Sequence, residues 1–274
     1  MGGLTDPPAA APEPAGLTPL EELYARYNDP AWLDPDPLAV ALRYRAPDDL
    51  EIAGLAAAAL ALGNAGLIVK AATAALAPLG PEPARTLAEL GFAAYAAALG
   101  DFKYRFFSGR QLASLLAGAA AIRARRGSLE EAFLSFDDPR EPDYASAASG
   151  LVRALRAASP EPWPSMLLPD PADGSAAKRT FLYLRWMIRR DRVDPGPWTR
   201  GDPARLVAPL DTHMAAACRR YGFLSRRSVD LKAAREASAA LRRVRPDDPL
   251  RYDFCMTRPG IRPDLSPDDC FGCA

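Results

Sequence analysis

The chain has 274 residues, of which 49% are hydrophobic and 25% are charged, proportions that are ordinary for a globular protein with a buried core. It has no uncharged apolar run of about 18 residues and no basic segment followed by an apolar one at its start, so neither a membrane span nor a secretory signal is expected. The net charge is zero and four cysteines are too few for a disulfide scaffold, so we expect a cytoplasmic protein.

Helix start signals occur along most of the chain. Residues 1–17, rich in alanine and proline, predict a disordered tail, and residues 18–274 predict a single helical domain. Capping boxes, in which Ser or Thr is followed three residues later by Glu or Gln, begin helices at Thr18, Ser108 and Ser128. The predicted helices are 18–28, 50–62, 67–76, 83–98, 108–126, 128–136, 143–157, 175–190, 211–221, 228–243 and 250–256. No alternating strand pattern occurs, so the predicted fold class is all-α.

The charges are distributed unevenly along the chain. Between Lys178 and Arg245 there are 17 basic and 6 acidic residues, so the remainder of the chain is acidic. A basic half suggests a surface that faces a polyanion such as nucleic acid. The alternative is that these arginines form the solvated faces of amphipathic helices.

Two motifs in the basic half give a specific resemblance. Residues 174–180 (Gly-Ser-Ala-Ala-Lys-Arg-Thr) resemble the helix-hairpin-helix of the endonuclease III superfamily of DNA glycosylases, where a glycine-bearing turn precedes the helix with the catalytic lysine. Residues 210–214 (Leu-Asp-Thr-His-Met) resemble the superfamily's element with the catalytic aspartate, and residues 218–222 resemble the run that follows it. The long gap between Lys178 and Asp211 is similar to that of the archaeal 8-oxoguanine DNA glycosylases.

The resemblance implies a fold of two helical lobes with a cleft between them, in which the N-terminal helix packs with the C-terminal half. Lys178 would attack the sugar carbon of a flipped nucleotide and hold the sugar as a Schiff base. Asp211 would stabilise the positive sugar or take a proton from the amine, and both residues should lie in one cleft. Taken singly, each residue has a simpler interpretation. Lys178 can be a solvated lysine, and Asp211 can be an ordinary helix N-cap.

The resemblance also implies a set of DNA contacts. Backbone N–H groups of Gly174, Ser175 and Ala176 would hold a phosphate at a helix start. Asn64, in residues 62–68, would enter the space left by the flipped base, although Gly-Asn is also a common turn between helices. Arg105 lies in a segment that resembles an element of the oxoguanine branch. The other arginines expected near phosphates are Arg179, Arg189, Arg190, Arg219, Arg220, Arg226 and Arg227.

The cysteines and the single histidine are not expected to carry the chemistry. Relatives of endonuclease III hold an iron–sulfur cluster with four C-terminal cysteines, and Cys270 and Cys273 have the spacing of the middle pair. Cys255 lies too far upstream and no fourth cysteine follows, so no metal and no cofactor are expected. Cys218 is expected in the core, and His213 as a structural hydrogen-bonding group.

Three functions remain open at this point. The first is a DNA N-glycosylase with abasic-site lyase activity, which removes an oxidised purine such as 8-oxoguanine from duplex DNA. The second is a helix-hairpin-helix protein that binds nucleic acid without cutting it, and the third is a remodelled enzyme on the same scaffold. We expect a monomer with no membrane partner. The chain after residue 18 also resembles an uncharacterised bacterial family, through residues 23–28, 51–54, 184–189 and 252–254.

Overall fold

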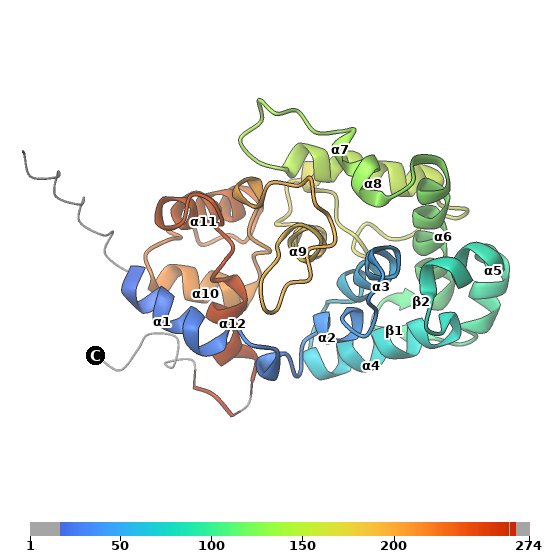
Figure 1. Ribbon diagram of the computed structural model, residues 1–274, viewed down its shortest axis with the longest axis horizontal. Helices are drawn as coiled ribbons and strands as arrows, with labels where there is room; N and C mark the ends of the chain where they lie inside the picture. Colours follow the sequence, from blue (N-terminus) through green and yellow to red (C-terminus); the bar gives the residue numbers. More distant parts are fainter. Residues whose placement is uncertain (1–16, 263, 267–274) are drawn as a thin grey trace, which may run out of the picture.

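The computed structural model describes residues 17–262 and 264–266, and it confirms the predicted all-α class (Figure 1). The α-helices of these residues are α1 (Leu17–Tyr27), α2 (Leu38–Ala41), α3 (Pro47–Ala59), α4 (Ala65–Leu76), α5 (Pro83–Ala98), α6 (Gly109–Arg126), α7 (Leu129–Leu134), α8 (Ala145–Ala158), α9 (Lys178–Ile188), α10 (Thr212–Arg220), α11 (Leu231–Val244) and α12 (Asp253–Ile261). The predicted tail lies outside the described residues except for Leu17, which begins α1.

Several helices begin where a side chain caps the backbone. Ser108 accepts a hydrogen bond from the N–H of Gln111, and the Gln111 side chain accepts one from the N–H of Ser108, which completes a capping box. The Ser128 side chain caps α7 by accepting a hydrogen bond from the N–H of Glu131. The Asp211 side chain caps α10 by accepting from the N–H groups of His213 and Met214. These starts were predicted because capping depends on residues close together in the sequence.

Other boundaries differ from the prediction. The helix expected from residue 175 begins only at Lys178, because Ala177 has φ 42°, a left-handed conformation that ends the preceding turn. The helix expected at 228 is capped by Asp230 instead, and the last helix starts three residues later than predicted and continues through Pro259. The one-turn helix α2 was not predicted.

A short antiparallel hairpin was also missed. It consists of β1 (Lys103–Tyr104) and β2 (Phe107–Ser108), with Lys103 opposite Ser108. Strands of two residues are too short to show the alternation on which strand prediction depends. The turn between them contains Arg105, whose φ of 53° is left-handed.

Helix α9 lies at the centre of the molecule. Figure 1 shows α1, α10, α11 and α12 on one side of it, and α2 to α6 with the hairpin on the other. All residues of α9 after Lys178 are buried, and α9 packs against the alanine-rich α3. A Cβ on Gly54 would lie 2.9 Å from the Met187 side chain, so this glycine allows the two helices to approach closely.

Helix α1 packs against α12, as predicted from the resemblance. The Tyr252 hydroxyl donates to Glu21 at 2.6 Å, and the Arg251 guanidinium lies 3.9 Å from the centre of the Tyr24 ring. The first described helix is therefore held on the C-terminal part of the chain.

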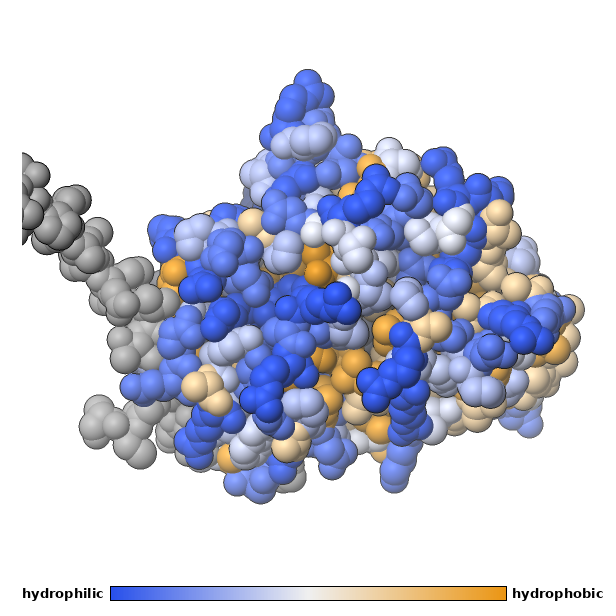
Figure 2. All heavy atoms as spheres, viewed as in Figure 1, coloured by the Kyte–Doolittle hydropathy of each residue, from blue (hydrophilic) through white to orange (hydrophobic). Residues whose placement is uncertain are grey.

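The surface is mainly hydrophilic. Figure 2 shows hydrophilic residues over most of the visible face, with a group of hydrophobic residues exposed near its centre. None of the helices in the described part of the chain is both long and apolar enough to cross a bilayer.

Candidate functional site

A cavity of about 400 Å³ lies at the start of α9, and a volume of this order is typical of small-ligand pockets. Five separate segments contribute to its wall, so it exists only in the folded chain. The lining residues fall within 35–37, 61–68, 178–185, 209–213 and 253–261.

Lys178 and Asp211 meet in this cavity. Lys178 is the first residue of α9, Asp211 is the N-cap of α10, and Lys178 Nζ lies 2.9 Å from Asp211 Oδ2. Their side chains are 32% and 23% exposed, so both border the cavity and neither is sealed in the core. The structure thus brings together two residues that are 33 positions apart in the sequence.

The Asp211 carboxylate is fixed by the helix that it caps. Its Oδ1 accepts hydrogen bonds from the backbone N–H groups of His213 and Met214, both at 2.9 Å, which leaves Oδ2 for Lys178. Burial acts to raise the pKa of Asp211, but the charge of Lys178 and the N–H of Met214 outweigh it, and the pKa lies below its usual value. The carboxylate is therefore ionised at neutral pH.

The turn before α9 differs from the expected hairpin. A 3-10 turn (Pro171–Asp173) precedes it, whereas the preceding α-helix, α8, ends at Ala158. The N–H of Gly174 donates to Pro171, and the N–H of Ala177 donates to the Ser175 hydroxyl. Gly174 and Ser175 are exposed, but Ala176 is buried. The Gly174 N–H is therefore already used within the turn, whereas the phosphate contacts predicted for Ser175 and Ala176 stay predictions.

Two of the arginines predicted to contact DNA are buried. Arg179 donates to the Ala59 carbonyl at 3.4 Å and lies over the Phe107 ring, and its burial lowers its pKa to about 10. Arg189 is 1% exposed and binds carboxylates inside the protein. The prediction of phosphate contacts for Arg179 and Arg189 is therefore wrong, because both side chains lie in the core.

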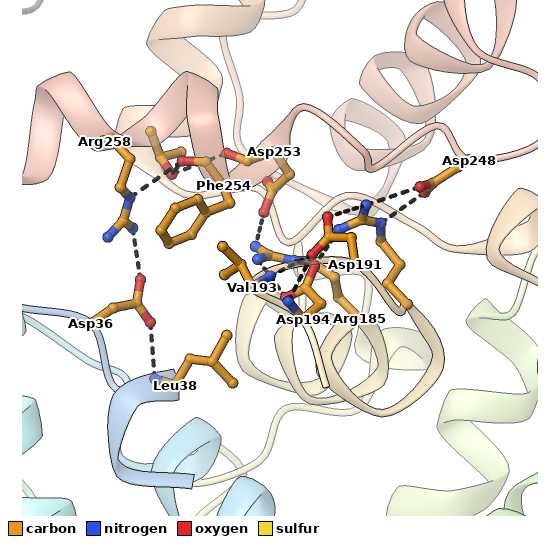
Figure 3. Close-up of polar contacts among 12 residues, drawn as sticks. Asp36, Leu38, Arg185, Asp191, Val193, Asp194, Asp248, Asp253, Phe254 and Arg258 are labelled. Carbon is orange, nitrogen blue, oxygen red and sulfur yellow. Dashed lines mark hydrogen bonds and ion pairs between the residues drawn. The ribbon is translucent and has the colours of Figure 1, made fainter. Parts of the chain in front are cut away.

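Arg189 and Arg185 of α9 belong to one buried cluster of charges. Figure 3 shows its members Arg185, Asp194, Asp248 and Asp253. Arg185 binds Asp194 at 2.8 Å and also pairs with Asp253 at the start of α12. Arg189 pairs with the same Asp194 and binds Asp248 at 2.8 Å. The cluster fixes α9 to the segments that enclose the cavity on the C-terminal side.

The remaining arginines near α10 lie at the surface. Arg219 is exposed, but its guanidinium donates to the carbonyls of Arg226 and Arg227, so it shapes the loop that leads to α11. Arg226 binds Asp230 at 3.1 Å. Arg190 and Arg227 are also exposed and remain candidates for phosphate contacts. Arg220 is exposed as well.

The excess of basic residues does not give a uniformly basic surface. Many arginines of the basic half pair with acids that lie outside it in the sequence. The pairs are Arg192–Asp29, Arg200–Glu131, Arg205–Asp137, Arg235–Asp143 and Arg245–Glu21, together with the contacts of α9 to Asp248 and Asp253. The excess of basic residues between Lys178 and Arg245 is therefore partly neutralised by ion pairs with acidic residues from the rest of the chain.

Asn64 lies at the wall of the cavity, and Arg105 lies against the neighbouring Gly63. Asn64 lines it and caps α4, where its side chain accepts from the N–H of Leu67 at 3.2 Å. Gly63 also lines it, and a Cβ added there would lie 2.1 Å from Arg105 Nη2. The hairpin turn therefore places the Arg105 guanidinium directly against the Gly63–Asn64 turn.

His213 and the cysteines have different surroundings. His213 is exposed and lines the cavity, and no hydrogen bond joins its ring to the described residues, so its structural role stays a prediction. Cys218 and Cys255 are buried, and burial raises the pKa of each thiol to about 12. Cys270 and Cys273 lie outside the described residues, within which no cluster of metal-binding side chains occurs.

Comparison with known families gives one match. A model of the family described as a protein of unknown function, DUF2400, covers residues 36–262. The chain belongs to the DUF2400 family. No curated protein and no solved structure matches it. The matched range includes nearly all of the cavity wall.

Sequence reasoning missed part of the site of this DUF2400 protein. Asp36, Asp253 and Arg258 line the cavity, and Arg258 is only 2% exposed. Asp253 falls in the segment 252–254 of the family resemblance but was given no role, and no role was predicted for Asp36. Nothing near Arg258 in the sequence shows that this arginine turns inward to meet Asp36.

Proposed function

We propose that this protein is a DNA N-glycosylase with abasic-site lyase activity that removes an oxidised purine through a lysine Schiff base. The observation that supports it best is the meeting of Lys178 and Asp211 at the wall of one cavity, with Asn64 at the border. The proposal includes the two-lobed fold of the DNA glycosylases, with α9 between the lobes. The site has the size for one nucleobase with its sugar.

The reaction begins when a damaged nucleotide leaves the base stack and its sugar reaches Lys178. The Nζ lone pair forms a bond to C1′ while the bond between C1′ and the base breaks, and the base leaves with that electron pair and takes up a proton. Nζ then loses a proton, and the C1′–O4′ bond opens as O4′ is protonated. The product is a protonated Schiff base between Lys178 and C1′.

The state of Asp211 indicates its role. Its pKa lies below its usual value, so it is a weak acceptor for the ammonium proton at neutral pH. A fixed, ionised carboxylate beside C1′ instead stabilises the positive charge that develops on the sugar. We therefore assign Asp211 an electrostatic role.

The alternative function is nucleic-acid binding without catalysis. Lys178 pairs with Asp211 in the structure, and an ammonium group in such a pair has no free lone pair with which to attack carbon. For the enzyme, substrate entry has to separate this pair and release the proton to solvent. For a binding protein, the pair simply stays intact.

Borohydride trapping separates the two functions. The protein is mixed with duplex DNA that contains 8-oxoguanine or a preformed abasic site, and sodium borohydride reduces any Schiff base to a stable adduct. The enzyme gives an adduct that Lys178→Ala abolishes. The matched control is Lys232→Ala, which removes an exposed lysine on α11 and should keep the adduct. DNA binding without an adduct in the wild-type protein would leave the binding function and refute the enzyme.

A further inference from the structure

The part of the cavity wall formed by α12 contains a buried arginine with an unused hydrogen-bond donor. Arg258 on α12 donates from Nη2 to Asp36 Oδ2 at 2.7 Å and from Nε to the Phe254 carbonyl at 3.3 Å (Figure 3). Its guanidinium lies 4.1 Å from the centre of the Phe254 ring. Nη1 is buried and has no hydrogen-bond partner among the described residues.

An unpaired donor of this kind is unusual. Buried polar groups are nearly always hydrogen-bonded, and leaving a charged donor unpaired costs stability. Among the described residues that line the cavity, Arg258 alone has a buried side-chain nitrogen or oxygen without a partner. The cavity is the place from which a ligand could supply the missing acceptor.

Asp36 fixes the orientation of this donor. Its Oδ1 accepts from the backbone N–H of Leu38 at 2.9 Å, and its Oδ2 accepts from Arg258. Asp36 therefore holds the guanidinium by one edge and leaves Nη1 as the remaining donor. Because a carboxylate has about four acceptor positions, Asp36 can also accept a bond from a ring N–H.

Arg258 Nη1 is a charged donor, and the Asp36 carboxylate beside it is an acceptor. Together they complement a base that carries a carbonyl oxygen next to a ring N–H. Guanine, 8-oxoguanine, hypoxanthine and uracil carry this arrangement, whereas adenine has an amino group at the corresponding position. Arginine contacts guanine through its carbonyl oxygen far more often than it contacts adenine. A site built to hydrogen-bond one substrate group discriminates strongly against an analogue that lacks it.

We infer that Arg258 is a specificity-determining residue that binds the exocyclic carbonyl of a keto-bearing base through Nη1, and that Asp36 positions it. This inference rests on the proposed function, since Lys178, which lines the same cavity, would hold the sugar of the same nucleotide. Because Nη1 is buried, the proposed contact requires the guanidinium to turn toward the cavity when the base enters.

The test compares base removal with the trapping of preformed abasic sites, because abasic DNA carries no base for Arg258 to bind. Duplexes with 8-oxoguanine, hypoxanthine, uracil or adenine at one position are assayed for base release, and an abasic duplex is assayed by borohydride trapping. The wild-type protein should release one or more keto bases and no adenine. In Arg258→Gln, the ratio of keto-base release to abasic trapping should fall roughly 10- to 100-fold.

Two further variants control for folding. Arg262→Gln removes the next arginine of α12, which lies over Trp32 and pairs with Asp264, and it should leave the ratio unchanged. Arg258→Lys keeps a cation beside Asp36 and should restore part of the ratio if Arg258→Gln folds poorly.

The outcomes separate the two proposals. If the wild-type protein traps no abasic DNA, the proposed function fails and this inference fails with it. If it traps abasic DNA but releases no keto base, the base removal in the proposed function and the inference on Arg258 are both overturned, and only the lyase step stands. If it releases a keto base and Arg258→Gln keeps the wild-type ratio, the inference on Arg258 alone is overturned.

Discussion

Replacing Asp211 with asparagine or alanine separates its two structural roles. Asp211 caps α10 through Oδ1 and pairs with Lys178 through Oδ2. Asparagine keeps an oxygen that can accept from the N–H groups of His213 and Met214, but it has no charge. Alanine removes both the cap and the charge.

The expected magnitudes follow from these contacts. The ion pair is partly exposed, so its loss in Asp211→Asn should lower the free energy of unfolding by about 0.5 kcal/mol. Asp211→Ala also loses the N-cap, which adds about 1 kcal/mol, for a total of about 1.5 kcal/mol. In a Lys178→Met background, Asp211→Asn should have almost no effect, because its partner is already gone.

Urea unfolding followed by circular dichroism measures these differences, and single-turnover borohydride trapping measures the chemistry of the same variants. Asp211→Asn should slow trapping by a factor of about 100 or more, since an uncharged amide does not stabilise a positive sugar in the same way. Equal destabilisation by the two substitutions would refute the capping geometry. Full trapping activity in Asp211→Asn would refute the electrostatic role.

Four further predictions concern the rest of the molecule. The pKa of Asp211 is lower in the folded than in the unfolded protein, so ionised Asp211 stabilises the fold above its ordinary pKa. This stabilisation is lost as the pH falls through the folded pKa. The difference in free energy of unfolding between wild type and Asp211→Asn should therefore be smaller at pH 3 than at pH 7 in urea unfolding. Arg189→Ala strands buried carboxylates and should cost about 3–5 kcal/mol in urea unfolding, whereas Arg190→Ala should change stability by less than about 0.5 kcal/mol. Gly63→Ala forces a side chain into φ 106° and against Arg105, and should cost about 1 kcal/mol or more by the same assay. Binding to duplex DNA in fluorescence titrations should weaken steeply between 50 and 200 mM salt, on the order of a thousandfold if about six phosphates are contacted, and a flat response would contradict the phosphate contacts.

Helix starts were predictable where one side chain bonds to a backbone group two or three residues away. Ser108, Ser128 and Asp211 all cap the helices that they were expected to begin, because that chemistry is local. The start of α9 was not predictable in this way. It depends on the left-handed backbone of Ala177, and alanine carries no sequence signal for that conformation.

Whether each arginine is buried or exposed could not be predicted from composition. Arg179, Arg189 and Arg190 look alike in the sequence, yet two are buried and one is exposed. The difference depends on partners such as Asp248, which lies 59 positions from Arg189. Pairing over that distance is a property of the fold, so a count of charges in the basic half overestimated the surface available to DNA.

The buried charges of α9 connect the fold to the candidate site. Arg185 holds Asp253, which begins α12, and the same helix carries Arg258 about one turn later. Lys178 begins α9 two turns before Arg185, so the Arg185–Asp253 ion pair joins the helix that begins with Lys178 to the helix that carries Arg258. Replacing buried ion pairs with well-packed apolar residues is often neutral for stability, so their value here lies in orientation. The proposed reaction requires Lys178 and Arg258 at a fixed separation, and the Arg185–Asp253 pair is a buried contact that joins the two helices that carry them.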